Sequence, residues 1–313
     1  MASGKDIKSR ISSVKNIQKI TRAMEMVAAA RLRRAEQRIA ALRPYADAIR
    51  RMTRRAVEAA ENIPGLPLLQ ERENVQRVGL LLVTGDRGLA GAFNSQIIRA
   101  GNRRRKEIEA EGAEVAWFAA GRRGVSSINF RGFDLEGGYE GFTDRPAYSD
   151  ARGIADDLTS KYIDGKVDRV EIFYNGYVSA LTQEVRHETL LPLQQADILG
   201  DEGQDGEANA DDAEGLDGGK GDAPDHTRSL WIYEPGPEEI LERLAPDYVE
   251  ISIYRALLES TASEHGARMT AMRNASENAT ELIDDLTLEA NRQRQADITQ
   301  EIMEVVAGAE GLG

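Results

Sequence analysis

The sequence predicts an α/β fold in which an α/β domain lies between two long helices that pair as an antiparallel coiled coil. Three observations support this. Both ends of the 313-residue chain carry apolar residues at helical spacing with little proline, the middle alternates strand and helix patterns, and the two ends carry opposite net charge. Two such long helices cannot each bury an apolar stripe against one compact domain, so they are expected to pair with each other.

Residues 1–62 form the predicted N-terminal helix, in which Pro44 is the only proline. A helix from Asp6 to Ala60 would be about 80 Å long at roughly 1.5 Å per residue. We expect Pro44 to bend or interrupt it, because proline inside a helix costs about 3 kcal/mol. Apolar residues spaced three or four apart are expected to face inward: Ile7, Ile11, Val14, Ile17, Ile20, Met24, Val27, Leu32, Ile39, Leu42, Ile49 and Met52. Ala28, Ala35 and Ala46 are expected to fill the thinner part of this stripe.

Residues 246–309 form the predicted C-terminal helix, followed by a short tail at 310–313. No proline follows Pro246, and a helix from there to Ala307 would span about 90 Å. Gly308 marks its end. Its predicted inward stripe consists of Tyr248, Ile251, Tyr254, Leu257 or Leu258, Thr261, His265, Met269, Met272, Ala275, Ala279, Ile283, Leu286, Ala290, Ile298, Ile302 and Val305.

Residues 63–245 alternate strand and helix signals, which is typical of a largely parallel, Rossmann-like α/β sheet. We expect an antiparallel pair of strands at one edge, near residues 170–191. Strands are expected at 75–84, 114–120, 168–174, 181–191 and 229–234, and helices at 92–111, 122–130 and 150–163.

The charge is unevenly distributed along the chain, whose net charge is −13. Residues 1–60 hold 15 Lys and Arg against 5 Asp and Glu, whereas residues 246–309 hold 5 against 12. Residues 197–225 hold 11 acidic residues and one lysine. Because 200–226 is rich in Gly and acids, it cannot bury enough apolar surface to offset its ordering entropy, and we predict a disordered insert.

Composition excludes several classes of site. The chain has no cysteine and only three scattered histidines, so neither a thiolate site nor a histidine metal cluster is expected. No catalytic, cofactor-binding or metal-binding residues stand out. No apolar run approaches the ~20 residues that a membrane span needs, and the N-terminus lacks the apolar region of a signal peptide. The basic N-terminal helix lacks interleaved aromatic residues, which favours a solvated helix face over a nucleic-acid surface.

A glycine-rich loop at Thr84–Gly91 follows a predicted strand and precedes a predicted helix. Such a position can hold a phosphate, but the GxxGxxG spacing differs from GxGxxG and no GxxxxGK[ST] motif is completed. We therefore expect a structural loop, formed by Gly85, Asp86, Arg87, Gly88 and Gly91, with a local ion pair between Asp86 and Arg87. The alternative is an α/β nucleotide-binding protein with a coiled-coil interaction stalk.

Four blocks of sequence resemble the gamma subunit of F-type ATP synthases. They are IKSRISSVKNIQKITRAMEMVAAARLRRAE (7–36), TGDRGLAGAFN (84–94), EHGARMTAMRNASENA (264–279) and RQADITQEIMEVVAGA. The second block usually begins TSDRGLCG in that family, so Gly85 and Ala90 replace the usual Ser and Cys. The blocks occur in the family's order across almost the whole chain, which makes the resemblance specific.

The resemblance implies a non-catalytic rotor without cofactors. In this family one gamma subunit stands inside a hexamer of three alpha and three beta subunits, and its α/β domain binds the epsilon subunit and the c-ring. Proton flow turns the ring, and the shaft then drives the beta sites through their states. The resemblance also implies a peripheral location on the cytoplasmic side of a bacterial membrane, attached only through the complex.

Individual residues acquire roles only through this resemblance. Met24 matches a position near an acidic loop of the beta subunit, and Lys19 and Arg22 lie on the same stretch. Arg294 and Gln295 match a pair that hydrogen-bonds a beta-subunit loop. The remaining implied contacts with alpha and beta are Ile298, Thr299, Glu301, Ile302 and Val305.

The acidic insert departs from the common family pattern. Relatives from chloroplasts and cyanobacteria carry an insertion at about this place, and chloroplast members place a cysteine pair in it. Because this chain has no cysteine, thiol control is excluded. Two alternatives stay open, namely a brake that acts through charge on the c-ring or the epsilon subunit, and a tolerated insertion without a role.

Overall fold

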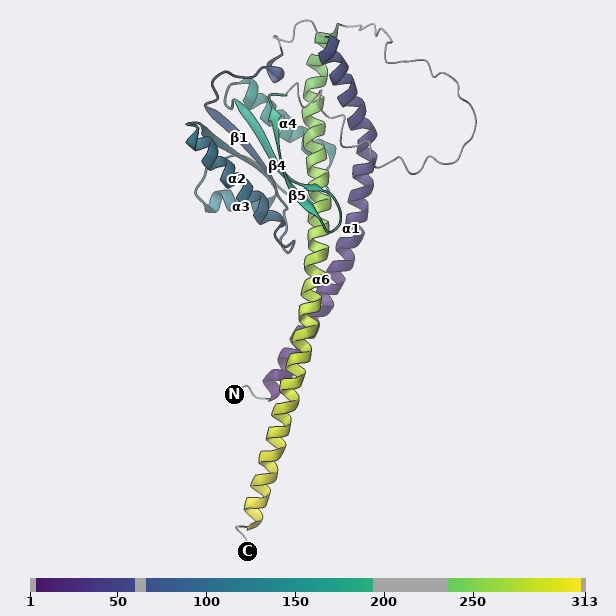
Figure 1. Cartoon of the computed structure of the whole chain (residues 1–313), viewed down its shortest axis with the longest axis vertical. Helices are drawn as coiled ribbons and strands as arrows, with labels where there is room; N and C mark the ends of the chain where they lie inside the picture. The colour runs from purple at the N-terminus through teal and green to yellow at the C-terminus, as the bar shows by residue number, and fades with distance from the viewer. Residues whose placement is uncertain (1–3, 60–65, 194–235, 311–313) are drawn as a thin grey trace, which may run out of the picture.

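Two long helices and an α/β domain make up the protein. The computed structural model describes residues 4–59, 66–193 and 236–310. Helix α1 (Gly4–Ala59) and helix α6 (Pro237–Glu310) lie side by side and run in opposite directions, and the α/β domain packs on one flank of the pair (Figure 1). The predicted fold class is thereby confirmed.

The α/β domain follows the predicted alternation of strands and helices. In chain order its elements are η1 (Pro67–Leu69), β1 (Arg77–Val83), α2 (Phe93–Ala110), β2 (Glu114–Ala120), α3 (Arg122–Phe130), β3 (Leu135–Tyr139), α4 (Tyr148–Ile163), β4 (Arg169–Tyr177) and β5 (Gln183–Leu191). The strands form one sheet in the order β3-β2-β1-β4-β5. Strands β3, β2, β1 and β4 are parallel, and β5 runs antiparallel to β4 at the edge, as expected.

Strand β3 was not predicted. Its sequence, LEGGY, contains two glycines and one glutamate, and its burial alternates between half-buried and exposed side chains. An edge strand of this composition carries no apolar run. The segment is a strand because it pairs with β2, with Leu135 opposite Trp117 and Tyr139 opposite Ala120.

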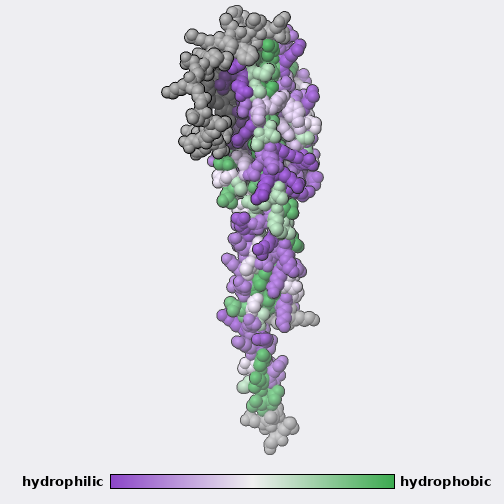
Figure 2. Space-filling model, turned by 90° about the vertical axis from the view of Figure 1, so that its right-hand side faces the viewer, coloured by the Kyte–Doolittle hydropathy of each residue, from purple (hydrophilic) through white to green (hydrophobic). Residues whose placement is uncertain are grey.

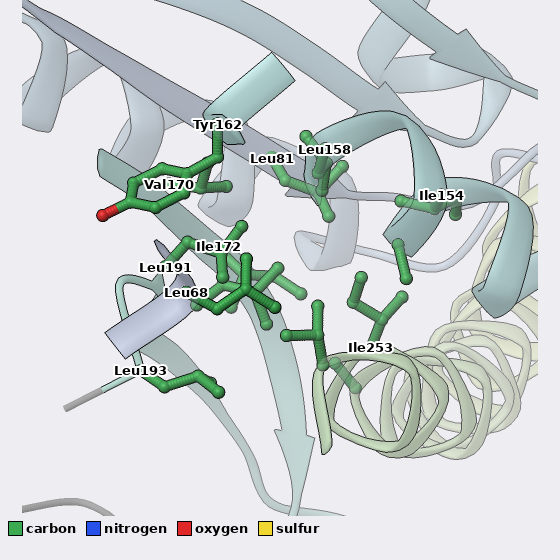
Figure 3. Close-up of a cluster of buried hydrophobic side chains, with 14 of the residues drawn as sticks. Leu68, Leu81, Ile154, Leu158, Tyr162, Val170, Ile172, Leu191, Leu193 and Ile253 are labelled. Carbon is green, nitrogen blue, oxygen red and sulfur yellow. The ribbon is translucent and has the colours of Figure 1, made fainter. Parts of the chain in front are cut away.

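The sheet buries both faces, because successive strand residues point in opposite directions. Leu80 and Leu82 of β1 pack toward α2 and α3. Leu81, on the opposite face, joins Ile154 of α4 and Ile253 of α6 in the larger core, which Figure 3 shows. Helix α6 is therefore both half of the coiled coil and a layer of the α/β domain.

Both long helices pass through a proline. Helix α1 continues across Pro44, so the expected interruption there is wrong. Helix α6 begins at Pro237 rather than Pro246, which lies inside it. Leu241, Leu244 and Ala245 are buried in this additional stretch, and their packing explains why the helix persists despite a lost hydrogen bond. The predicted insert at 200–226 and the strand at 229–234 lie outside the described residues.

Candidate functional site

The face of α1 that meets α6 follows a seven-residue repeat. Two interleaved sets of residues, each spaced seven apart, are buried or half-buried along the whole helix. A repeat of 3.5 residues per turn keeps one seam facing the partner and winds the pair into a left-handed supercoil. The first set is Ile7, Val14, Thr21, Ala28, Ala35, Leu42, Ile49 and Ala56, and the second is Ile11, Gln18, Glu25, Leu32, Ile39, Ala46 and Thr53.

Part of the predicted inward stripe of α1 faces outward instead. Ile17, Ile20 and Val27 are 54%, 58% and 53% exposed, and Met52 is 52% exposed, so their assignment to the interior is wrong. The seam runs through Thr21 and other polar residues that the predicted stripe left out, and through Ala28, Ala35 and Ala46, which it included. Apolar residues spaced three and four apart can be found on two different faces of α1. Which of these faces is buried depends on where the partner helix packs.

Two contacts across the seam fix the register of the helices. Gln18 donates to the hydroxyl of Thr280 at 2.7 Å, and the Arg273 guanidinium lies 2.9 Å from the Glu25 carboxylate. A step of seven residues forward on α1 thus corresponds to a step of seven residues backward on α6. Continuing this register brings the beginning of α1 to the level of Arg294.

Beyond that level α6 extends without its partner, and its C-terminal end lies farthest from the α/β domain (Figure 1). Every residue from 294 to 306 is exposed, including Arg294 and Gln295. The other predicted contact residues on this end are exposed too, namely Ile298, Thr299, Glu301, Ile302 and Val305. Ile302 and Val305 are 57% and 72% exposed, and Figure 2 shows apolar surface gathered near this tip. An apolar end of this kind is typical of an interaction site.

The predicted contact residues near the start of α1 lie on a mixed surface. Lys19 and Arg22 are exposed, whereas Met24 is half-buried beside the seam. The exposed Ile17 and Ile20 accompany them on the outside of the coil. Because residues three or four apart share a helix face, Ile17, Ile20 and Met24 lie on one flank of α1, and Lys19 and Arg22 lie on the other.

The Thr84–Gly91 loop is organised around the Asp86 carboxylate. This carboxylate accepts hydrogen bonds from the backbone N–H groups of Arg122 at 3.0 Å, Gly141 at 3.0 Å and Thr143 at 3.2 Å, and from the Thr143 hydroxyl at 2.9 Å. Burial alone would raise the pKa of Asp86, but these hydrogen bonds outweigh it and lower the pKa. Because Asp86 binds these groups and Arg87 makes no ion pair with any described residue, the predicted local pair is wrong.

The same loop is unsuited to hold a phosphate. The N–H of Gly85 donates to the Asn94 side chain at 2.8 Å, and the N–H of Asp86 donates to the Thr143 hydroxyl at 2.8 Å. The carboxylate of Glu264 lies directly against Gly85 and would repel an anion. Both the occupied amides and the adjacent negative charge count against the nucleotide-binding alternative.

Within the described ranges, no helix is long and apolar enough to cross a membrane. Among the same residues, no group of three or more His, Asp or Glu side chains is arranged to hold a metal ion.

Comparison with known proteins gives consistent matches over the whole chain. The family model described as ATP synthase matches residues 3–312. The ATP synthase gamma chain of Rubrobacter xylanophilus is 42% identical over 312 residues, covering 100% of this chain and 99% of the relative. That of Nostoc punctiforme is 43% identical over 322 residues and covers 100% of both chains.

Solved structures share the fold. A chain of the Euglena gracilis mitochondrial ATP synthase in its OSCP/F1/c-ring assembly aligns with a TM-score of 0.65 at 16% identity, covering 99% of this chain and 94% of that one. A chain of the central stalk and c-ring of the Tetrahymena thermophila enzyme aligns with a TM-score of 0.57 at 24% identity, covering 82% and 99%.

Proposed function

The chain belongs to the ATP synthase gamma-chain family and is its non-catalytic central-stalk rotor subunit, and on this premise we propose how its surfaces couple rotation to ATP synthesis and hydrolysis. The coiled coil of α1 and α6 stands inside a hexamer of alpha and beta subunits. The α/β domain binds the epsilon subunit and the c-ring. One copy serves each complex, on the cytoplasmic side of a bacterial membrane, and the chain touches that membrane only through its partners.

The observation that carries this proposal is the unpaired end of α6. Ile298, Ile302 and Val305 are exposed on a single helix that extends past the level where α1 begins. A single amphipathic helix presents different side chains in different directions, so an apolar sleeve of alpha and beta subunits would meet a different surface at each rotational position. Arg294 and Gln295, at the base of this end, hydrogen-bond a loop of one beta subunit at a time.

A second contact lies on the outside of the coil near Met24. Lys19 and Arg22 are exposed there and attract an acidic loop of the beta subunit. The neighbouring Ile17 and Ile20 supply apolar contact area.

In this proposal the shaft comprises 1–62 and 246–309, with a tail at 310–313, and the α/β domain comprises 63–245. The Thr84–Gly91 loop has a structural role.

Reconstitution with alpha and beta subunits tests the proposal. The chain should co-purify with them in the family's ratio of one to three to three, and the complex should hydrolyse ATP faster than alpha and beta alone. In the membrane-bound enzyme, Met24→Lys should reduce ATP-driven proton pumping relative to ATP hydrolysis, because it places a cation at the position assigned to the acidic beta loop and holds that loop more tightly.

Met52→Lys provides the matched control. Met52 is also a methionine of α1 and is 52% exposed, but it lies 28 residues, about 42 Å, along the helix from Met24. The control should pump normally. Normal pumping by Met24→Lys would overturn the contact assigned to Met24, and failure of the unmodified chain to join alpha and beta would overturn the proposed function itself.

A further inference from the structure

The α/β domain touches the coiled coil through a group of buried polar side chains on α6. Ser263, Glu264, His265 and Arg268 are 0%, 3%, 2% and 8% exposed. Charged and polar groups are rarely buried to this degree without directed partners. Where their partners lie therefore shows what this stretch of α6 holds in place.

The partners of Glu264 and Arg268 include the glycine-rich loop of the α/β domain. Arg268 forms an ion pair with Glu264 and also donates to the carbonyl of Gly88 at 3.3 Å. The Glu264 carboxylate lies so close to Gly85 that a Cβ atom there would come within 2.8 Å of it. The pair thus lies between the shaft and the loop that Asp86 organises.

Further contacts surround this pair at the same level of the shaft. The Thr261 hydroxyl donates to the carbonyl of Thr143 at 2.9 Å, and the Ser263 hydroxyl donates to the carbonyl of Asn175 at 3.0 Å. Asp144, next to Thr143, forms an ion pair with Arg31 of α1. Both helices of the shaft are therefore tied to the α/β domain here by directed contacts.

We infer that the contacts of Thr261, Glu264 and Arg268 with the 84–91 and 143–144 segments form a joint that prevents the α/β domain from turning or sliding relative to the shaft. Apolar packing is non-directional, whereas hydrogen bonds and ion pairs lose strength within a fraction of an ångström or a few tens of degrees. Glu264 and Arg268 are positioning residues in this view. The inference rests on the proposed function, because a rotor needs this rigidity to carry torque.

Rigidity can be measured on the full chain without its partners. Because the chain has no cysteine, the exposed Arg131 of the α/β domain and Arg33 of α1 can be replaced by cysteines and spin-labelled. The distance between the labels should be narrowly distributed in the otherwise unmodified chain and broad with Glu264→Gln, which removes the charge that binds Arg268. A narrow distribution in the variant would overturn the inference whether or not the chain is a rotor.

Glu239→Gln is the matched control. Glu239 and Arg243 are also a glutamate and an arginine four residues apart on α6, but their side chains are 54% and 76% exposed. The control should keep the narrow distribution. Should Glu264→Gln fail to fold, Thr261→Val removes only the hydroxyl that donates to Thr143 and should broaden the distribution to a smaller extent.

The mechanical consequence is tested in the membrane-bound enzyme. Glu264→Gln should retain ATP hydrolysis but lose proton pumping, since the shaft turns without turning the α/β domain fully. Normal pumping in Glu264→Gln would overturn the joint and leave the proposed function intact.

Discussion

At the scale of single residues, buried ionisable groups hold the elements together, and sequence reasoning located them only in part. His265 was assigned to the inward stripe of the C-terminal helix and is indeed buried. Glu264 and Arg268 were not included in that stripe, and charged residues are usually solvated. Their burial depends on a loop that is about 180 positions away in sequence and meets them only in the folded chain.

Glu171 on β4 is a second buried charge. Its side chain is 2% exposed and receives two hydrogen bonds from Arg104, at 2.9 and 3.0 Å, and one contact from His187 at 2.8 Å. Burial alone would raise the pKa of Glu171, but the hydrogen bonds from His187 and Arg104 outweigh it and lower the pKa to about 2. The network joins α2, β4 and β5.

Glu171→Gln should lower the free energy of unfolding by about 3 kcal/mol near neutral pH, because Arg104 loses its buried charged partner and keeps only Glu107 and Glu111, whose side chains are 49% and 59% exposed. Since the folded-state pKa lies below that of the unfolded chain, the stabilisation is complete above a pH of about 4.5 and is lost as the pH falls toward 2. Urea unfolding at neutral and acidic pH measures this. The difference between the original chain and the variant should shrink in acid.

Glu136→Gln serves as the comparison for this prediction. Glu136 pairs with Arg77 at 2.6 Å, but both side chains are about one-third exposed. Solvent screening should limit its loss to about 1 kcal/mol or less. An equal loss in the two variants would show that burial of Glu171 does not determine its contribution.

At the scale of elements, the coiled coil was predictable in kind but not in register. Long stretches with little proline and with helical spacing predicted both helices and their pairing. The predicted seam was wrong in part, since Ile17 and Ile20 face solvent, whereas Thr21, which was not predicted, faces α6. Small residues on a seam carry little hydrophobic signal, although they allow two helices to approach closely.

Two aliphatic residues on α6 allow a test of which part of this helix packs against α1 and which part is left for partner subunits. Leu286 is 5% exposed within the paired region, whereas Ile302 is 57% exposed beyond it. Leu286→Ala should destabilise the isolated chain by about 2–3 kcal/mol, because it leaves a cavity in the seam. Ile302→Ala should change that stability by less than about 0.5 kcal/mol and should instead weaken binding to alpha and beta subunits.

Denaturant unfolding and a co-purification assay measure the two effects separately. A large loss of stability with Ile302→Ala would mean that the end of α6 packs within the chain rather than against partners. A stability unchanged by Leu286→Ala would contradict the assigned seam.

At the scale of the whole molecule, one helix serves two bodies. Helix α6 completes a core of the α/β domain through Ile253 and pairs with α1 along most of the length of α1. Because α6 packs on more than one side, every residue from 250 to 268 is buried or half-buried. A prediction of one apolar stripe could not have anticipated this. The alternation of strands and helices was predictable from local pattern, whereas the edge strand β3 depended on a pairing partner.

The central claim is that this chain turns as a unit inside a ring of alpha and beta subunits. The most direct measurement attaches a probe to a cysteine placed at the exposed Arg131 of the α/β domain, fixes the reconstituted alpha and beta subunits to a surface, and observes the probe during ATP hydrolysis. The account predicts rotation in one direction that stops when ATP is exhausted. Steady hydrolysis with a stationary probe, in a complex shown to contain the chain, would contradict it.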